Sequence, residues 1–454
     1  GPARSYPWQQ SVDRLNVTGY LQPGANVLAV EVYQPGYSHF AYTHRGAAGL
    51  LAWLRCDDCT VLVSDLTWRV RRNPSFNPLV PRVSIYGSGV EDRDLRREDN
   101  WWAPAYDSSG WSAPRVAAPI GGYPWLELHE RVTPLLEERE LSLVLAEVRT
   151  GFLAADVEPH LALRTAWQAG TRVAPEAWRP ADGWLAASTE AGTGWLFDLG
   201  RAYPCQGWVE IEGAVAGQTL LVSYAEKTRS GELVISDPQT YCRVRMTDLY
   251  HLRSGDQVAE SFAFRGGRYL LFWLSGPAPH GCRLRCHART LQYPLGPVQP
   301  LPTSDPQLQE IARLCEQTLL ACLQDSFVDS AWRESSLWLG DASRAAWARA
   351  TWQRLATGFE RLWDEGRGVY VDHLLHGEPQ RPVSEHTNAA ALCAGLVPEH
   401  RIPRVAASLT ERERLVRASW LLPGRTTPPE DGDMYAGAII PGLMLTALYC
   451  LFIL

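Results

Sequence analysis

The sequence predicts a multidomain chain in which two β-rich domains precede a helical one. Short apolar runs between clusters of Gly, Pro, Asn and Asp fill the first two thirds, a pattern typical of β-sandwiches and barrels. After Asp305, apolar residues recur at the spacing of an amphipathic helix. Strands followed by helices indicate separate domains rather than one α/β sheet. We expect domains at residues 1–145, 146–297 and 298–454.

The individual elements follow from the same patterns. In the first domain, the turn P-G-A-N at 23–26 precedes an expected strand at 28–33, and 60–70 is a second strand-rich run. Strands of the second domain are expected at 195–200, 207–212, 219–225 and 269–274, before a proline-rich linker. A helix is expected to begin at Asp305-Pro306, because proline favours the first helical position. Further helices are expected at 342–363, 387–395, 403–422 and 436–454.

Composition limits the classes of partner. The net charge of −7 argues against a nucleic-acid-binding protein. Nineteen Trp are compatible with stacking on sugars, although core filling in β-sandwiches explains most of them equally well. No signal peptide and no uninterrupted apolar stretch of ~18 residues is found, so we expect no membrane partner and a cytoplasmic location.

The ten cysteines include two closely spaced pairs. Cys56 and Cys59 form C-x-x-C, and Cys282 and Cys286 form C-x-x-x-C, which together could supply four thiolates to zinc. The two pairs are far apart in the sequence and the other cysteines are scattered, so we expect no metal and no other cofactor.

One segment concentrates groups that can do chemistry. Residues 329–342 read D-S-A-W-R-E-S-S-L-W-L-G-D-A, with three carboxylates, one Arg and two Trp. Glycoside hydrolysis needs a carboxylic acid to protonate the leaving oxygen and a second carboxylate to activate water or attack the sugar. On spacing alone, an amphipathic helix with an Arg–Asp pair on its wet face is the more common explanation.

The same segment resembles the hallmark motif of the bacterial-type α-L-rhamnosidase family, D-x-x-x-R-E-x-x-x-W-x-G-D-A. Residues 17–30, 262–269 (F-A-F-R-G-G-R-Y) and 384–392 are similar to other parts of that family. The resemblance implies two β-sandwich (jelly-roll-like) domains followed by a partial (α/α)6 six-hairpin domain. It also implies an inverting hydrolase of terminal α-L-rhamnosyl groups, acting on a rhamnose-containing glycoside or oligosaccharide. By position, Glu334 matches the general acid, and the residues that match the rhamnose-holding set are Asp329, Arg333, Trp338 and Asp341.

The helical region departs from the family. Too few residues follow Asp305 for twelve helices of ~11 residues with ~5-residue connections, so we expect a truncated and internally deleted barrel that does not close. The family's catalytic base has no counterpart in its expected motif. The remaining candidates, Glu385, Glu430, Asp431 and Asp433, are more typical of solvated surface charges. We therefore expect slow turnover.

Two other functions remain open. The chain could be a non-catalytic carbohydrate-binding protein, or a degenerate family member with no function. A different six-hairpin glycosidase, such as an unsaturated uronyl hydrolase, would not explain the Arg-Glu segment. The sequence does not predict an oligomeric state.

Overall fold

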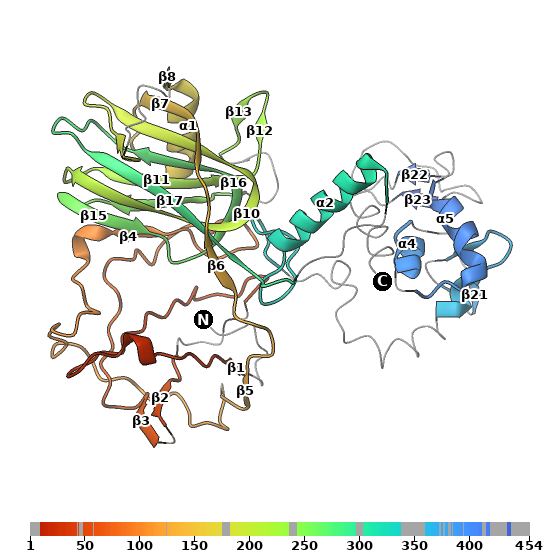
Figure 1. Ribbon diagram of the computed structural model, residues 1–454, viewed down its shortest axis with the longest axis horizontal. Coiled ribbons are helices and arrows are strands. Elements are labelled where there is room, and N and C mark those ends of the chain that lie inside the picture. Colours follow the sequence, from red (N-terminus) through yellow and green to blue (C-terminus); the bar gives the residue numbers. More distant parts are fainter. Residues whose placement is uncertain are drawn as a thin grey trace. The chain divides into compact units, whose positions relative to one another are not determined.

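The structure is a computed structural model, shown in Figure 1. It describes residues 10–42, 44, 49–57, 59–123, 125–174, 182–235, 243–296, 303–336, 359–371, 374–375, 377–379, 383, 385–393, 395–410, 415–417 and 434–436. The chain divides into two compact units, the first made of Gly1–Pro294 and Leu320–Leu337, and the second of Leu295–Leu319 and Trp338–Leu454. None of the helices in the described ranges is long and apolar enough to cross a bilayer. The domain limits expected at 145 and 297 stay predictions.

A folded-over antiparallel sheet forms the centre of the first unit. Its strands are β4 (Asp92–Asp94), β6 (Glu137–Glu140), β7 (Val144–Gly151), β8 (Thr171–Val173), β9 (Leu185–Ala186), β10 (Gly192–Ala214), β11 (Thr219–Ala225), β14 (Thr247–His251), β15 (Gly255–Glu260), β16 (Arg265–Leu274) and β17 (Arg283–Gln292). The main strand order is β4-β14-β11-β16-β10-β17-β6, with β7 and β15 also paired to β10. The parallel pair β4–β14 is the exception to the antiparallel pattern.

The strand β10 belongs to both layers. Its first part pairs with β7 and β16, and its second part pairs with β15 and β17. Between them the register against β16 shifts from Asp198↔Tyr269 to Tyr203↔Gly267. Gly200 has φ +77° there, and Arg268 pairs with Asp198 through two 2.8 Å contacts. This bend lets one strand supply both layers of a sandwich.

Successive apolar side chains along the strands point alternately to the two faces of the sheet and form the core. On β11 and β16, Leu220, Val222, Leu270 and Phe272 face the interior between the two layers. Their neighbours turn to the outer face, where they pack with the helix α1 (Pro159–Ala169). Figure 1 shows α1 beside β7 and β8. Pro159 lies at the start of α1, where its missing N–H costs nothing.

Residues before β6 contain little regular structure in the described ranges. The short elements are β1 (Gln10–Val12), the 3₁₀ turn Thr18–Tyr20, β2 (Trp53–Cys56), β3 (Cys59–Val63), the 3₁₀ turn Leu95–Arg97 and β5 (Leu128–Glu130). The strand expected at 28–33 is not formed, and this expectation was wrong. No described strand pairs with this segment, and Leu28, Val30 and Val32 stay 39–48% exposed.

The second unit combines short helices and hairpins. Its elements are α2 (Pro306–Ala321, whose last residues belong to the first unit), the 3₁₀ turn Glu360–Leu362, β18 (Trp363–Asp364), β19 (Val369–Tyr370), β20 (Leu374–Leu375), β21 (Glu378–Pro379), α4 (Glu385–Cys393), the 3₁₀ turn Glu399–Arg401, α5 (Ile402–Thr410), β22 (Leu415–Arg417) and β23 (Met434–Ala436). The side chain of Asp305 accepts from the N–H groups of Gln307 (2.8 Å) and Leu308 (3.4 Å), so it caps α2. The remaining small sheet, β12 (Thr228–Arg229) with β13 (Glu232–Leu233), belongs to the first unit.

The helix predictions have a mixed outcome. α2, α4 and the first half of the helix expected at 403–422 are confirmed. The second half of that helix is wrong at Leu415–Arg417, which pairs in parallel with Met434–Ala436. Of the helix expected at 342–363, the part to 358 lies outside the described residues, and its end is a 3₁₀ turn and a short strand. The helix expected from Ala436 also lies outside the described residues beyond that position.

Candidate functional site

The segment that carries Glu334 is a compact loop in its described part, not the helix that its spacing allowed. The hydroxyl of Ser330 accepts from the N–H groups of Arg333 (3.3 Å) and Glu334 (3.4 Å). Asp329 and Ser336 close the loop: Asp329 N–H donates to the Ser336 carbonyl (2.9 Å), and Ser336 N–H donates to Asp329 Oδ1 (3.0 Å). Ser335 adopts φ +50°, which ends any helical continuation here.

Three contacts fix this loop on the sandwich. The Trp332 indole N–H donates to the Tyr224 carbonyl (3.1 Å) at the end of β11. The Ser84 hydroxyl donates to the Arg333 carbonyl (2.9 Å). Gly266 of β16 lies so close that a Cβ would come within 2.5 Å of the Ala331 carbonyl carbon and oxygen. The first glycine of F-A-F-R-G-G-R-Y is therefore explained by this contact, because only a residue without a side chain admits the loop.

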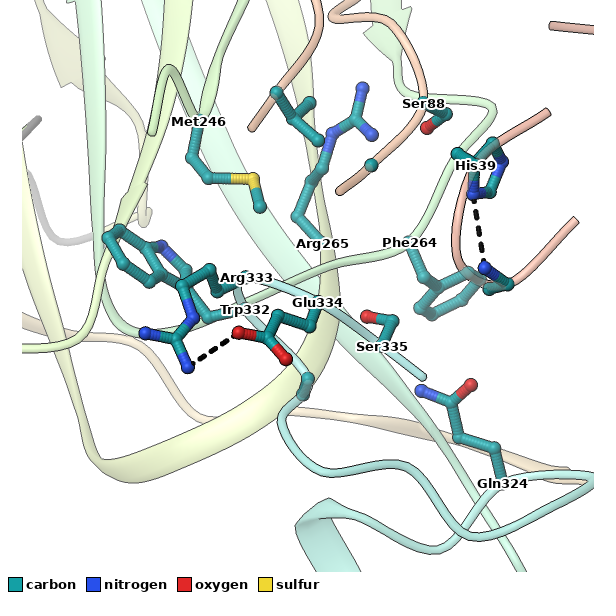
Figure 2. Close-up of a pocket in the computed structure, with 14 residues that line it drawn as sticks. His39, Ser88, Met246, Phe264, Arg265, Gln324, Trp332, Arg333, Glu334 and Ser335 are labelled. Carbon is teal, nitrogen blue, oxygen red and sulfur yellow. Dashed lines mark hydrogen bonds and ion pairs between the residues drawn. The ribbon is translucent and has the colours of Figure 1, made fainter. Parts of the chain in front are cut away.

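A cavity of about 180 Å³ opens beside Glu334. Figure 2 shows its lining, which includes His39, Met246, Arg265, Gln324, Trp332 and Glu334. Glu334 is only 8% exposed, and its Oε1 lies 2.8 Å from Arg333 Nη2, which compensates the charge of a buried carboxylate. Arg333 remains 39% exposed, so the pair connects the buried carboxyl group with solvent.

Arg265 lines this cavity, and it is bonded to a network of buried charged groups. Arg265, 4% exposed, donates to Asp248 Oδ1 (2.9 Å) and to the Gly89 carbonyl (3.1 Å). Glu91 lies 4.0 Å from the same guanidinium and accepts from the N–H groups of Phe262 (2.9 Å) and Ala263 (2.7 Å). Burial and the nearby Asp248 raise the pKa of Glu91 to about 7, against the opposing effect of Arg265. The network ties residues near 90 to β14 and β16 behind the site.

The structure describes part of the predicted site. Glu334 and Arg333 are together and line the cavity, whereas Asp329 is not among its lining residues and holds the loop closed. Trp338 and Asp341 lie outside the described residues, as do the alternative bases Glu430, Asp431 and Asp433. Glu385 begins α4, without a described side chain. The grouping of Glu334 with Asp341 and Trp338 in one pocket therefore stays a prediction.

Sequence reasoning missed Glu226. This residue directly follows β11, next to the strand end that binds Trp332. Desolvation raises the pKa of Glu226, while the charges of Lys227 and Arg333 lower it. A second carboxyl group thus interacts electrostatically with the arginine that pairs with Glu334. The sequence shows only that Glu226 follows the strand expected at 219–225. No sequence pattern relates it to Glu334.

The cysteine alternative finds no support in the described residues. Cys56 and Cys59 face each other across the hairpin β2–β3, whereas Cys282 is buried and Cys286 lies within β17. No group of three or more His, Cys, Asp or Glu side chains within the described ranges could hold a metal ion.

Comparison with known proteins identifies the fold. No family model and no curated protein matches the sequence. Among solved structures, the GH78 family rhamnosidase of Bacillus sp. GL1 superposes with a TM-score of 0.68 at 15% identity, covering 91% of this chain and 76% of that chain. The chain has the fold of an α-L-rhamnosidase. The resemblance that the motifs predicted is confirmed at the level of the fold.

Two other solved α-L-rhamnosidases match less of their own length. The Aspergillus terreus enzyme matches at 16% identity and a TM-score of 0.43, covering 80% of this chain and 38% of that chain. The Streptomyces avermitilis enzyme, solved with L-rhamnose, matches at 15% identity and a TM-score of 0.40, covering 79% of this chain and 32% of that chain. This chain therefore spans about a third of the length of these two proteins.

Proposed function

We propose that this protein is a glycoside hydrolase that removes terminal α-L-rhamnosyl groups with inversion. The observation that supports this most directly is the position of Glu334, a buried carboxyl group beside a cavity, in a chain with the fold of the Bacillus rhamnosidase. Its motif match to the family's general acid adds an independent argument from the sequence.

In this mechanism Glu334 acts as the general acid. Its proton passes to the glycosidic oxygen as the bond from that oxygen to the anomeric carbon breaks. A water molecule attacks the anomeric carbon from the opposite face, and a base carboxylate accepts the proton that the water loses. Arg333, Trp338 and Asp341 are proposed to hold the rhamnose, and Asp329 is proposed to support them by closing the loop that carries Arg333 and Glu334.

Glu226 is our candidate for the base in the described chain. An inverting enzyme needs its two carboxyl groups roughly 6.5–9.5 Å apart, so that a water molecule fits between base and sugar. Glu334 forms an ion pair with Arg333, and the charge of the same Arg333 lowers the pKa of Glu226, so one guanidinium acts on both carboxyl groups. Desolvation also favours proton uptake by Glu226, as a general base requires.

The helical region is proposed to be a partial six-hairpin domain. The helices α2, α4 and α5 are compatible with hairpin elements, and the family resemblance of 384–392 falls on α4. A partial barrel would present fewer sugar-binding residues, and this is our physical reason for expecting slow turnover.

Hydrolysis of p-nitrophenyl α-L-rhamnoside tests the proposal. We expect slow release of p-nitrophenol by the wild-type chain and a ~10²–10⁴-fold lower kcat in Glu334→Gln, because the amide cannot donate the proton. Glu310→Gln is the matched control, since Glu310 lies on the exposed surface of α2, where it pairs with Arg313. Equal rates for wild type and Glu334→Gln would contradict the assignment. Rhamnose binding by calorimetry without turnover would instead support a carbohydrate-binding protein.

A further inference from the structure

The hairpin β2–β3 places two cysteines opposite each other. The strands pair antiparallel with the register Trp53↔Val63, Leu54↔Leu62, Arg55↔Thr60 and Cys56↔Cys59. Directly opposite residues of an antiparallel pair have their side chains on the same face, with Cα atoms about 4.5–5.5 Å apart. A disulfide needs a Cα separation of about 4.4–6.8 Å. The closing pair of this hairpin therefore meets the backbone requirement for a bond between the two sulfur atoms.

Exposure separates this pair from the buried cysteines. Cys56 and Cys59 are both exposed. Burial raises the pKa of Cys205 to about 12, and of Cys282 and Cys322 to about 11, so those thiols remain protonated. The thiolate is the form that attacks disulfides. Thiol–disulfide exchange is consequently favoured at Cys56 and Cys59 over the three buried thiols.

A crosslink would also stabilise the hairpin. In the described chain β2 and β3 form a two-stranded sheet of their own, and Trp53, Val61 and Val63 stay 45–57% exposed. An isolated two-stranded hairpin is only marginally stable in water. Asp57 adopts φ +51° in the turn, which costs backbone energy. A covalent bond between the strand ends would keep this turn closed.

We propose that Cys56 and Cys59 are a redox-active dithiol that forms a reversible disulfide by exchange with a low-molecular-weight disulfide such as glutathione disulfide. One thiolate attacks a sulfur of glutathione disulfide and releases one glutathione thiolate. The thiolate of the second cysteine then attacks the cysteine sulfur of the mixed disulfide. The Cys56–Cys59 bond forms as the second glutathione leaves as a thiolate. Two protein thiols are oxidised and one glutathione disulfide is reduced to two thiols.

A single tryptic peptide reports the result. Arg55 and Arg69 flank the pair with no Lys or Arg between them, so both cysteines fall in the peptide 56–69. Folded protein is equilibrated in glutathione redox buffers, quenched with acid, alkylated and digested for mass spectrometry. We expect peptide 56–69 to lose two hydrogen atoms and to resist alkylation at both cysteines. We also expect its exchange constant to be about tenfold more favourable than that of the same chain unfolded in urea, a difference of about 30 mV.

Matched variants complete the experiment. Cys56→Ser and Cys59→Ser each leave one exposed thiol, so each should carry only a glutathione adduct, while Cys205 stays alkylatable after unfolding. Persistent glutathione adducts on both cysteines of the folded wild type, without an internal disulfide, would overturn the proposal. An exchange constant in urea equal to that of the folded protein would overturn it as well, because the hairpin would then contribute nothing.

Discussion

Arg333 connects two carboxyl groups at the end of β11. Its guanidinium lies 2.8 Å from Glu334, and its charge opposes the rise in the pKa of Glu226 that desolvation causes. Glu334 is in direct contact with this guanidinium, whereas Glu226 receives only a longer-range contribution from it. The two carboxyl groups thus have different electrostatic surroundings.

Replacing Glu226 tests its proposed role as the base. We expect Glu226→Gln to lower kcat for p-nitrophenyl α-L-rhamnoside by ~10²-fold or more, because water then loses its proton acceptor. The acidic limb of the kcat/KM profile should disappear with it, an effect that a merely structural residue would not produce. Glu212→Gln, at a surface ion pair with Arg283, is the control. An unchanged pH profile in Glu226→Gln would exclude Glu226 as the base.

Asn388 hydrogen-bonds to the backbone of β19 in the second unit. The buried side chain accepts from Tyr370 N–H (2.8 Å) and donates to the Tyr370 carbonyl (2.9 Å), as a neighbouring strand would. Removing it leaves two buried backbone groups without these bonds. Asn388, within the family-like segment 384–392, therefore has a structural role in the packing of the second unit.

Asn388→Ala should destabilise the second unit by about 1–3 kcal/mol for each backbone group left unsatisfied. Asn388→Asp should retain the bond from Tyr370 N–H but lose the bond to its carbonyl, and we expect a loss of stability in this variant too. Urea unfolding followed by fluorescence measures both. Two variants with wild-type stability would show that water replaces the amide.

Residue-level prediction from the sequence could use only local motifs. The order D-x-x-x-R-E placed Arg333 and Glu334 in one expected site with separate roles, and in the structure the two side chains form an ion pair. Glu226 could not be found in this way, because only the folding of β11 against the loop brings it near Arg333. The amphipathic helix that spacing alone allowed is not formed at 329–336, because Ser330 binds the following N–H groups and diverts the chain.

At the scale of elements, β16 is the support on which the loop rests. Gly266 admits the Ala331 backbone, and on the neighbouring strand Tyr224 supplies the carbonyl that binds Trp332. Both strands have alternate side chains in the two cores, so their position is strongly fixed. A rigid pair of strands therefore positions the segment that carries Glu334.

Gly266→Ala should displace the loop. The added Cβ would lie 2.5 Å from backbone atoms of Ala331 and 2.7 Å from the Trp332 nitrogen, and a backbone cannot rotate away as a side chain can. We expect a kcat at least ~10-fold lower with a smaller effect on overall stability, since about an ångström of misplacement can cost ~10²-fold. Gly110→Ala is the matched control, because nothing lies within 4 Å of its Cβ position. Equal kcat in the two variants would contradict this support role.

Elements were predictable where the strand had partners and a buried face. The strand expected at 219–225 matches β11, and 269–274 lies within β16, because alternating apolar residues there face two cores. The strand expected at 28–33 is also mostly apolar, but it has no pairing strand in the described chain. β22 and β23 were missed because three-residue strands leave no periodic pattern to detect.

For the first unit as a whole, two buried titratable groups act on stability in opposite directions. The pKa of Glu91 is raised to about 7 from 4.5, chiefly by burial and Asp248. Its contribution to stability is therefore fully present below pH 4.5 and is lost as the pH rises to about 7. The pKa of His160, near the start of α1, is lowered to about 4 from 6.5, chiefly by burial. Its contribution is present above pH 6.5 and is lost as the pH falls to about 4.

Single variants should separate these two contributions. We expect the stability difference between wild type and His160→Gln to grow in favour of wild type as the pH rises from 4 to 6.5, because neutral His160 fits its buried site and the charged form does not. The difference between wild type and Glu91→Gln should shrink as the pH rises from 4.5 to 7, because the ionised carboxyl group is disfavoured beside Asp248. Urea unfolding free energies at intervals across this range measure both slopes. Slopes of the same sign would contradict the assignment of these two groups. Opposite slopes would explain a wild-type unfolding free energy that changes little between pH 4.5 and 6.5, because the contribution of His160 increases over this range while that of Glu91 decreases.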